Sequence, residues 1–356
     1  MFNQNVALAK IESSSPASAS VWDRVYAFDP YAIPTQSKFW AKAVLAGSGS
    51  REVSRHYCFS DGQEAVLPLF RRNILPLAIA VLNSPPPAWG FGGVLALAPL
   101  TKDHLIEILD DCSKLPGAAI SIRPNPLLAT EWRDAALAKG WSILPKNSHV
   151  LSLDGSFECV WKSRFSSNAR NKIRRAEKAN VKVELGNNEH LVADFVSLFR
   201  RSIDRWARKQ NEFEWLAQMR GHFRDSSKKF RLMAEHASQV LLIGIARHHG
   251  KPVAGAILLV DRNAHYTRGA MDERFIGKTY ANYLLQAKMI ERSCELKCGH
   301  YHMGETGNSR SLAQFKGQFG AVPVGYAELR HERLPVYSAE RTVRSGIKRL
   351  IGFSDV

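Results

Sequence analysis

Long apolar runs are missing from this sequence of 356 residues. The stretch at residues 74–82 comes closest to a membrane-like composition, and it is less than half of the roughly 20 residues that a spanning helix needs. The first residues lack the apolar core of a secretory signal, because Lys10 and Glu12 precede a Ser/Ala-rich stretch at residues 13–20. The sequence therefore predicts a cytoplasmic protein with a flexible leader over residues 1–20.

Cysteine is also scarce. The five cysteines are an odd number without a CxxC pair, which argues against a disulfide framework and against a zinc cluster. Cys294 and Cys298 lie one helical turn apart, and His300 and His302 share one face of an expected strand, so a metal site is conceivable. Packing and surface roles are commoner for such residues, and we predict no bound metal.

Acidic residues are outnumbered by basic ones, 33 against 49, which gives a net charge of +16. Such a charge attracts phosphates, nucleic acid or an anionic lipid surface. The hydrophobic content of 45% is that of a globular protein, and the length suits two domains with separate cores. We place the domains at residues 21–150 and 151–335.

Two strand–turn–strand patterns indicate that the domains are similar units. The first is an apolar alternation over residues 51–72 with a turn signal at residues 60–62. The second joins residues 241–247 to residues 252–260 through a glycine-containing turn. Two copies of one α/β unit are the simplest interpretation.

Hydrophobic periodicity and turn residues predict the remaining elements. In the first unit we expect a strand at 79–82, a Pro/Gly-rich loop at 84–93, helices at 102–113 and 128–139, and strands at 118–122 and 141–153. In the second unit we expect helices at 159–179, 190–209, 214–225 and 279–296, strands at 181–185, 300–303 and 322–330 and from 241, 252 and 264, and a helix around Lys316.

The segment at residues 309–321, SRSLAQFKGQFGA, carries a lysine among apolar residues at helical spacing. Leu312, Phe315 and Phe319 fall on one stripe of a helix, with Lys316 beside it and half sheltered. A short strand directly precedes this helix, and α/β folds place chemistry at strand ends.

Four motifs follow one another along residues 21–330: a P-x-Q-S-x-x-W pattern, a basic R-x-x-I-R-x-A helix, a glycine loop around Gly277, and an FK-to-FG helix. In this order they resemble the FemABX-like peptidyltransferases and their BioF2-like (CelD-like) acyltransferase relatives, which have the GNAT fold. The resemblance implies an α/β (α+β) protein with two tandem GNAT-like domains, each a mixed, mostly antiparallel sheet flanked by helices.

The glycine loop is the expected donor site. Arg274, Gly277, Lys278 and Thr279 are similar to the R/Q-x-x-G-x-G/A phosphate loop of GNAT acyltransferases, although Thr279 replaces a small residue. A helix N-terminus offers free N–H groups and a positive dipole end to a pyrophosphate. Fem ligases have largely lost this loop, so its partial survival favours acyl-CoA over aminoacyl-tRNA as the donor. A plain strand-to-helix turn is the alternative.

Lys316 is the expected catalytic residue. It stands four residues before Gly320, where GNAT acetyltransferases commonly carry a tyrosine, and the resemblance implies that it stabilises charge during acyl transfer. The attacking amine needs a base, for which Glu305 is best placed and His302 is the reserve. The alternative is a lysine that covers the apolar stripe of its own helix.

Substrate contacts are predicted in three places. Arg170 and Arg174 lie one turn apart on one helix face, a spacing that suits a phosphate clamp, although a solvated basic helix is the alternative. Tyr266 and Trp89 are further candidates, with core and loop packing as their alternatives. We therefore expect a phosphate-bearing small molecule or a lipid-linked substrate.

Residues 336–356 form the last expected segment, a basic amphipathic helix that suits peripheral contact with an anionic membrane or docking on the protein's own core. The predicted function is transfer of an acyl group, from acyl-CoA, to an amine on a cell-envelope or polysaccharide-related substrate. An aminoacyl-tRNA-dependent ligase and a non-catalytic membrane or nucleic-acid adaptor are the alternatives.

Overall fold

The computed structural model describes residues 9–74, 79–275, 277–307 and 309–350. The first half of the chain forms β1 (Ile11–Pro16), α1 (Ala19–Phe28), α2 (Lys38–Ser48), β2 (Arg51–Glu52), β3 (Arg55–Phe59), β4 (Glu64–Leu67), β5 (Phe70–Ile74), β6 (Ile79–Ser84), β7 (Leu95–Ala96), α3 (Lys102–Lys114), β8 (Ala119–Ile122) and α4 (Ala129–Ala138).

The second half forms β9 (Ser142–Ser152), α5 (Phe157–Ser163), α6 (Ser167–Lys178), β10 (Lys182–Gly186), α7 (Glu189–Lys209), α8 (Glu214–Arg224), α9 (Ser227–His236), β11 (Leu241–His248), β12 (Lys251–Val260), β13 (Ala264–Met271), α10 (Ala281–Glu295), β14 (His300–Glu305), α11 (Arg310–Gly317), β15 (Val322–Glu332) and α12 (Val336–Leu350). No described helix is long and apolar enough to cross a membrane.

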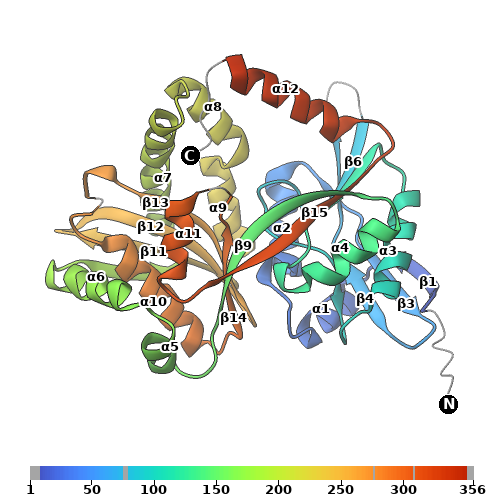
Figure 1. The fold of residues 1–356 in the computed structure, drawn as a ribbon, viewed down its shortest axis with the longest axis horizontal. Helices are drawn as coiled ribbons and strands as arrows, with labels where there is room; N and C mark the ends of the chain where they lie inside the picture. The colour runs from blue at the N-terminus through green and yellow to red at the C-terminus, as the bar shows by residue number, and fades with distance from the viewer. Residues whose placement is uncertain (1–8, 75–78, 276, 308, 351–356) are drawn as a thin grey trace.

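The two halves share one sheet (Figure 1). Eleven strands run in the order β10-β11-β12-β13-β14-β9-β15-β8-β6-β5-β2, and a smaller sheet has the order β1-β3-β4-β7. The long strands β9 and β15 pair with each other, while β14 flanks β9 and β8 flanks β15. Residue 150, where the sequence places the domain boundary, therefore lies inside a strand that joins the halves.

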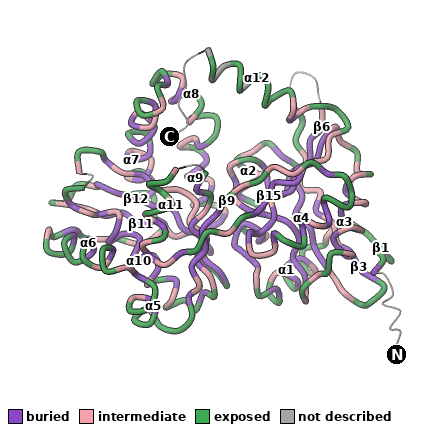
Figure 2. Tube along the Cα trace, in the orientation of Figure 1, coloured by how far each residue is buried: buried purple, intermediate pink, exposed green. Residues whose placement is uncertain are grey.

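Alternation along β12 explains how helices cover both faces of the sheet. Ile257 and Leu259 face the core formed with α7, whereas Ala256 and Leu258 face the core formed with α10, as the two-residue period of a strand requires. The first of these cores also contains Trp40 and other apolar residues of α1 and α2, so it joins the two halves. Figure 2 shows this buried interior as continuous stretches of the trace.

Several helices begin at a serine cap. Ser18, Ser37, Ser166 and Ser226 each accept the backbone N–H of the residue three positions on, at the starts of α1, α2, α6 and α9. These bonds satisfy N–H groups that have no partner inside the helix.

Four features differ from the expectations. Residues 11–16, expected in a flexible leader, form β1, because pairing with β3 satisfies their backbone groups. The helices α1, α2 and α9 were not predicted. The helix expected from residue 279 begins at Ala281, because Tyr280 is left-handed, with φ 49°. In the expected apolar stripe Phe319 is buried and Phe315 packs against the core, but Leu312 is exposed, and Lys316 is the buried residue within α11 itself.

Candidate functional site

The strands β13 and β14 separate after a short parallel contact. Ala264 pairs with Tyr301 and His265 with His302, and the register ends there. Gly304 follows with a left-handed φ of 72°, and a Cβ at that position would lie 3.1 Å from the carbonyl oxygen of Tyr266. A glycine is therefore favoured where the strands part, and the pairing with β13 does not extend to Gly304 or Glu305.

Lys316 occupies the end of this separation. Its side chain is buried, with 2% of its surface exposed, and Nζ donates to the carbonyl oxygens of Gly304 at 2.8 Å and Glu305 at 2.9 Å and to Oγ1 of Thr306 at 3.0 Å. These three bonds use the three protons of an ammonium group. The lysine thus satisfies backbone acceptors that the missing strand pairing leaves open.

Burial controls the charge of this lysine. It lowers the pKa of Lys316 to about 7, against an opposing contribution from Glu305. Thr306 connects the lysine to His149, whose Nδ1 lies 2.7 Å from Oγ1 of Thr306. Burial and then the lysine charge lower the pKa of His149 as well. The three side chains form a hydrogen-bonded row from β9 to α11, in which Lys316 is the member with a pKa near neutral.

Glu305 lies at the last position of β14, as predicted, with a partly exposed side chain. Its carboxylate accepts a hydrogen bond from the hydroxyl group of Tyr326 and lies 3.5 Å from Nζ of Lys146. Burial raises the pKa of Tyr326, and the neighbouring Glu305 adds to this effect. Lys316 contacts the backbone carbonyl of Glu305, so the two predicted residues meet while the carboxylate stays open to solvent.

His302, the reserve base, is fully buried beside Phe91 and His265. Neither of its ring nitrogens has a hydrogen-bond partner within the described residues. Burial holds the pKa of His302 well below its usual value, and burial likewise lowers the pKa of His265 to about 3. Both rings are therefore neutral at physiological pH. Across the described ranges, no group of three or more His, Cys, Asp or Glu residues could hold a metal.

The predicted donor loop is a closed turn in the part of it that the structure describes. The carbonyl oxygen of Phe275 accepts the amides of Lys278 at 3.2 Å and Thr279 at 3.3 Å, so these amides are already used. The guanidinium group of Arg274 is held by Asp272, at 2.6 Å and 3.0 Å. Gly277 has φ 76°, which explains the glycine. The helix α10 starts directly after this turn.

Two basic side chains that sequence reasoning did not select face this helix start. The ammonium group of Lys172 donates to the hydroxyl group of Tyr283 at 3.1 Å, and the guanidinium group of Arg175 lies 4.6 Å from the ring centre of Tyr280. Tyr283 in turn contacts Phe315 and Phe319 around α11. A chain of contacts therefore links the start of α10 to the helix of Lys316.

The two arginines of the predicted phosphate clamp on α6 have different surroundings. Nη1 of Arg170 donates to the carbonyl oxygens of Trp161 at 3.1 Å and Phe165 at 2.6 Å, near the end of α5. Arg174, one turn on, is exposed. The side chain of Arg170 therefore stabilises the end of α5. The sequence signal that would have identified Lys172 and Arg175 is their i, i+3 spacing on the same helix.

Trp89 lies at the junction of the two halves. Its carbonyl oxygen accepts the indole N–H of Trp40 at 2.9 Å, and the ammonium group of Lys229 lies 4.3 Å from its ring centre. With Asp225 and Arg268 these residues line a cavity of about 20 Å³. Tyr266, the other predicted contact, folds back over Gly269, and burial raises its pKa to about 12.

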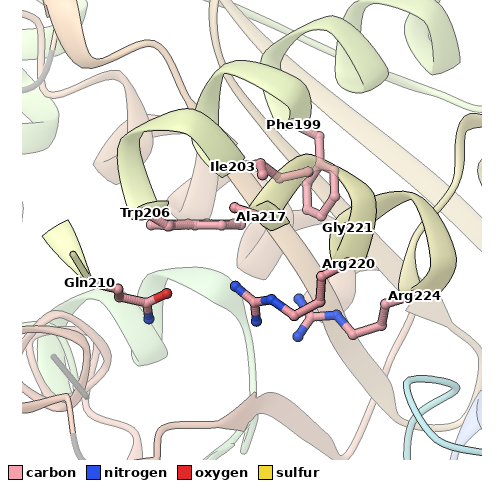
Figure 3. A pocket seen from close by; sticks show the side chains of 8 residues that line it. All are labelled: Phe199, Ile203, Trp206, Gln210, Ala217, Arg220, Gly221 and Arg224. Carbon is pink, nitrogen blue, oxygen red and sulfur yellow. The ribbon is translucent and has the colours of Figure 1, made fainter. Parts of the chain in front are cut away.

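A larger cavity, of about 110 Å³, lies between α7 and α8 (Figure 3). Phe199, Ile203, Trp206, Gln210, Ala217, Arg220, Gly221 and Arg224 line it, and none of them is a predicted site residue. Cavity size therefore does not mark the region of Lys316.

The described residues thus form a mixed sheet whose parallel strands part beside a buried lysine, with the basic helix α6 against the start of α10. Residues 163–316 match the family described as acetyltransferase (GNAT) domain, and this chain is an acyltransferase with the FemABX-like GNAT fold. No curated protein sequence matches the chain.

Three solved structures share the fold over most of the chain. FemX is 14% identical, with a TM-score of 0.70, over 92% of this chain and 99% of its own. A conserved protein of unknown function from Bacteroides thetaiotaomicron is 11% identical, with a TM-score of 0.54, over 90% and 99%. The C-terminal domain of a putative lysylphosphatidylglycerol synthetase from Agrobacterium fabrum is 12% identical, with a TM-score of 0.53, over 92% and 94%.

Proposed function

We propose that this enzyme transfers an acyl group from acyl-CoA to an amine of a cell-envelope or polysaccharide-related substrate. The observation that carries the proposal is the position of Lys316, whose buried ammonium group lies at the separation of β13 and β14 with its pKa near neutral. An entering carbonyl oxygen would replace Oγ1 of Thr306, the side-chain acceptor among its three partners.

Glu305 and Lys316 have different roles in this reaction. Glu305 takes the proton of the amine as its nitrogen bonds to the acyl carbonyl carbon, since its carboxylate is accessible and held by Tyr326 and Lys146. Lys316 stabilises the negative charge that develops on the carbonyl oxygen. The carbon–sulfur bond then breaks and the thiolate leaves, with Lys316 as the cation beside it. His302 is neutral and buried, which makes it the weaker candidate for the base.

The alternative donor is an aminoacyl-tRNA, for which the net charge of +16 offers phosphate contacts. FemX and the putative lysylphosphatidylglycerol synthetase share only the fold with this chain at their low identity. The exposed Arg174 remains a candidate residue for binding a phosphate of the acceptor. The same proposal places the enzyme in the cytoplasm, in peripheral contact with the membrane.

A donor screen tests this function. Thermal shifts and turnover with a model amine are measured for coenzyme A, a series of acyl-CoAs and bulk aminoacyl-tRNA. We expect stabilisation by coenzyme A and transfer from at least one acyl-CoA, because a bound donor stabilises only the folded state. Transfer from aminoacyl-tRNA alone would establish the alternative donor, and no response to any donor would overturn both.

The double variant Lys172→Ala/Arg175→Ala tests the place of the donor phosphates. Removal of two cations beside the start of α10 should weaken coenzyme A binding by about tenfold or more, measured by calorimetry. The matched control is Arg174→Ala on the same helix, whose exposed side chain should leave that affinity nearly unchanged. An equal effect of both variants would indicate only a general loss of positive charge.

A further inference from the structure

The helix α8 carries its small residues on the inner side and its large apolar residues on the outer side, the reverse of an ordinary surface helix. Its small residues face the protein: Ala217 is buried, and a Cβ on Gly221 would lie 2.6 Å from Cδ1 of Ile203 on α7. Figure 3 shows this inner side, where Ala217 and Gly221 adjoin the side chains of α7. An amphipathic helix normally turns its large apolar residues inward, and α8 does the reverse.

The outward side carries large apolar residues at every fourth position. Trp215, Met219 and Phe223 have 66%, 46% and 81% of their surface exposed, and Phe213, directly before the helix, has 61%. Single exposed apolar residues are common, but a row along one helix face is a patch that calls for a partner. The close fit of Gly221 against Ile203 holds this face outward.

The segment that carries the patch has an excess of basic over acidic residues. The exposed basic residues in and next to α8 are Arg208, Lys209, Arg220, Arg224, Lys228 and Arg231. The acidic residues of this segment are already paired: Glu214 with Arg208 at 2.8 Å, Glu212 with Arg220, and Asp225 with Arg224 at 2.9 Å. Large apolar side chains in a segment with an excess of arginine and lysine match the interface of an anionic bilayer.

We propose that the outer face of α8 docks on an anionic phospholipid bilayer, with Trp215, Met219 and Phe223 at the acyl boundary and the exposed Lys209, Lys228 and Arg231 on lipid phosphates. The helix α12 lies along the same upper margin of the molecule as α8 (Figure 1), and its residues Arg341 and Val343 are exposed. A second copy of the chain is disfavoured as the occupant, because two chains of +16 repel each other. This docking assigns to α8 the peripheral membrane contact of the proposed function, and its test does not depend on the transfer reaction.

Flotation of the full-length protein with vesicles tests the docking. We expect it to float with phosphatidylcholine vesicles that contain phosphatidylglycerol, to stay unbound with phosphatidylcholine alone, and to dissociate as salt is raised. The triple variant Trp215→Gln/Met219→Gln/Phe223→Gln should lower the partition coefficient at least tenfold. The matched control is Leu137→Gln on α4, which removes an apolar residue of 62% exposure elsewhere and should bind like the parent.

Three results would overturn the proposal: no binding of the parent protein to anionic vesicles, equal binding to neutral ones, or an unchanged partition coefficient in the triple variant. Light scattering measures the oligomeric state of both proteins. A dimeric parent protein and a monomeric triple variant would also overturn the proposal, because they would assign the face to a second copy of the chain. Should the triple variant fold poorly, Met219→Asp puts one negative charge at the centre of the face, and its unchanged binding would be equally decisive.

Discussion

Replacement of Lys316 by methionine should lower kcat by about one hundredfold to one thousandfold while donor affinity stays within a few fold. The reason is that a cation beside the reacting carbonyl acts on charge that exists only in the transition state. Steady-state kinetics and calorimetry with the same donor give both numbers. Equal losses in binding and turnover would instead make Lys316 a substrate anchor.

The pH dependence of turnover separates a working ammonium group from a structural one. Because the pKa of Lys316 is about 7, its charged fraction declines as pH rises through 7. At pH values where the acceptor amine is already deprotonated, kcat should decline with this fraction. The variant Lys316→Arg keeps a permanent charge, so whatever activity it retains should lack this decline. The same descending limb in both proteins would mean that another group titrates.

Stability supplies an independent measurement of the same residue. Folded Lys316 loses its proton near pH 7, whereas an unfolded lysine keeps it to its ordinary value of 10.5. Between these values the unfolded chain binds more protons, so the contribution of Lys316 to the free energy of unfolding rises with pH. The difference between the parent protein and Lys316→Met, from denaturant titrations, should therefore grow over this window.

The fold was largely readable from local signals. The glycine turn at residues 248–251 separates β11 from β12 as predicted, and the period-two pattern of β12 is visible in its sequence. Strand β1 was missed because its run of serines has no apolar pattern, and its strand state depends on pairing with β3. A sequence read alone also could not show that β9 and β15 join the halves into one sheet, since strand order follows from tertiary pairing.

The candidate site was readable only in part. Lys316 and Glu305 were identified because a motif marks them, and the structure places them together. The row through Thr306 to His149 was not, since these residues lie on segments that meet only in the folded chain. Arg170 and Arg174 share a helix face at the expected spacing, but spacing does not reveal that the carbonyl groups of α5 take up Arg170.

Asp225→Asn should lower the free energy of unfolding by about 3–5 kcal/mol at neutral pH. The carboxylate is buried and accepts from Lys229 at 2.9 Å, from Arg268 at 2.8 Å and from Arg224 at 2.9 Å. Lys229 and Arg268 also donate to the carbonyl oxygen of Ala88, at 2.8 Å and 3.1 Å, and so tie the loop of Trp89 to the second half. Loss of the negative charge leaves the cations unpaired at the junction of the halves.

The charge states fix the direction of the pH effect. The three surrounding cations outweigh burial and hold the pKa of Asp225 well below its usual value, whereas burial lowers the pKa of Lys229 to about 8 because one carboxylate serves several cations. The stabilising contribution of Asp225 is therefore complete above about pH 4, the usual range of an unfolded aspartate, and is lost as the pH falls toward the folded pKa.

Denaturant unfolding of Asp225→Asn, followed by tryptophan fluorescence, measures the loss, and the control is Glu158→Gln. Glu158 also contacts a lysine, Lys162, at 2.6 Å, but both side chains are about 70% exposed, so its loss should leave the free energy of unfolding nearly unchanged. The contrast separates a buried charge network from a surface ion pair of similar geometry. The two sites differ mainly in burial. Equal losses in the free energy of unfolding for the two variants would therefore show that Asp225 does not hold the halves together.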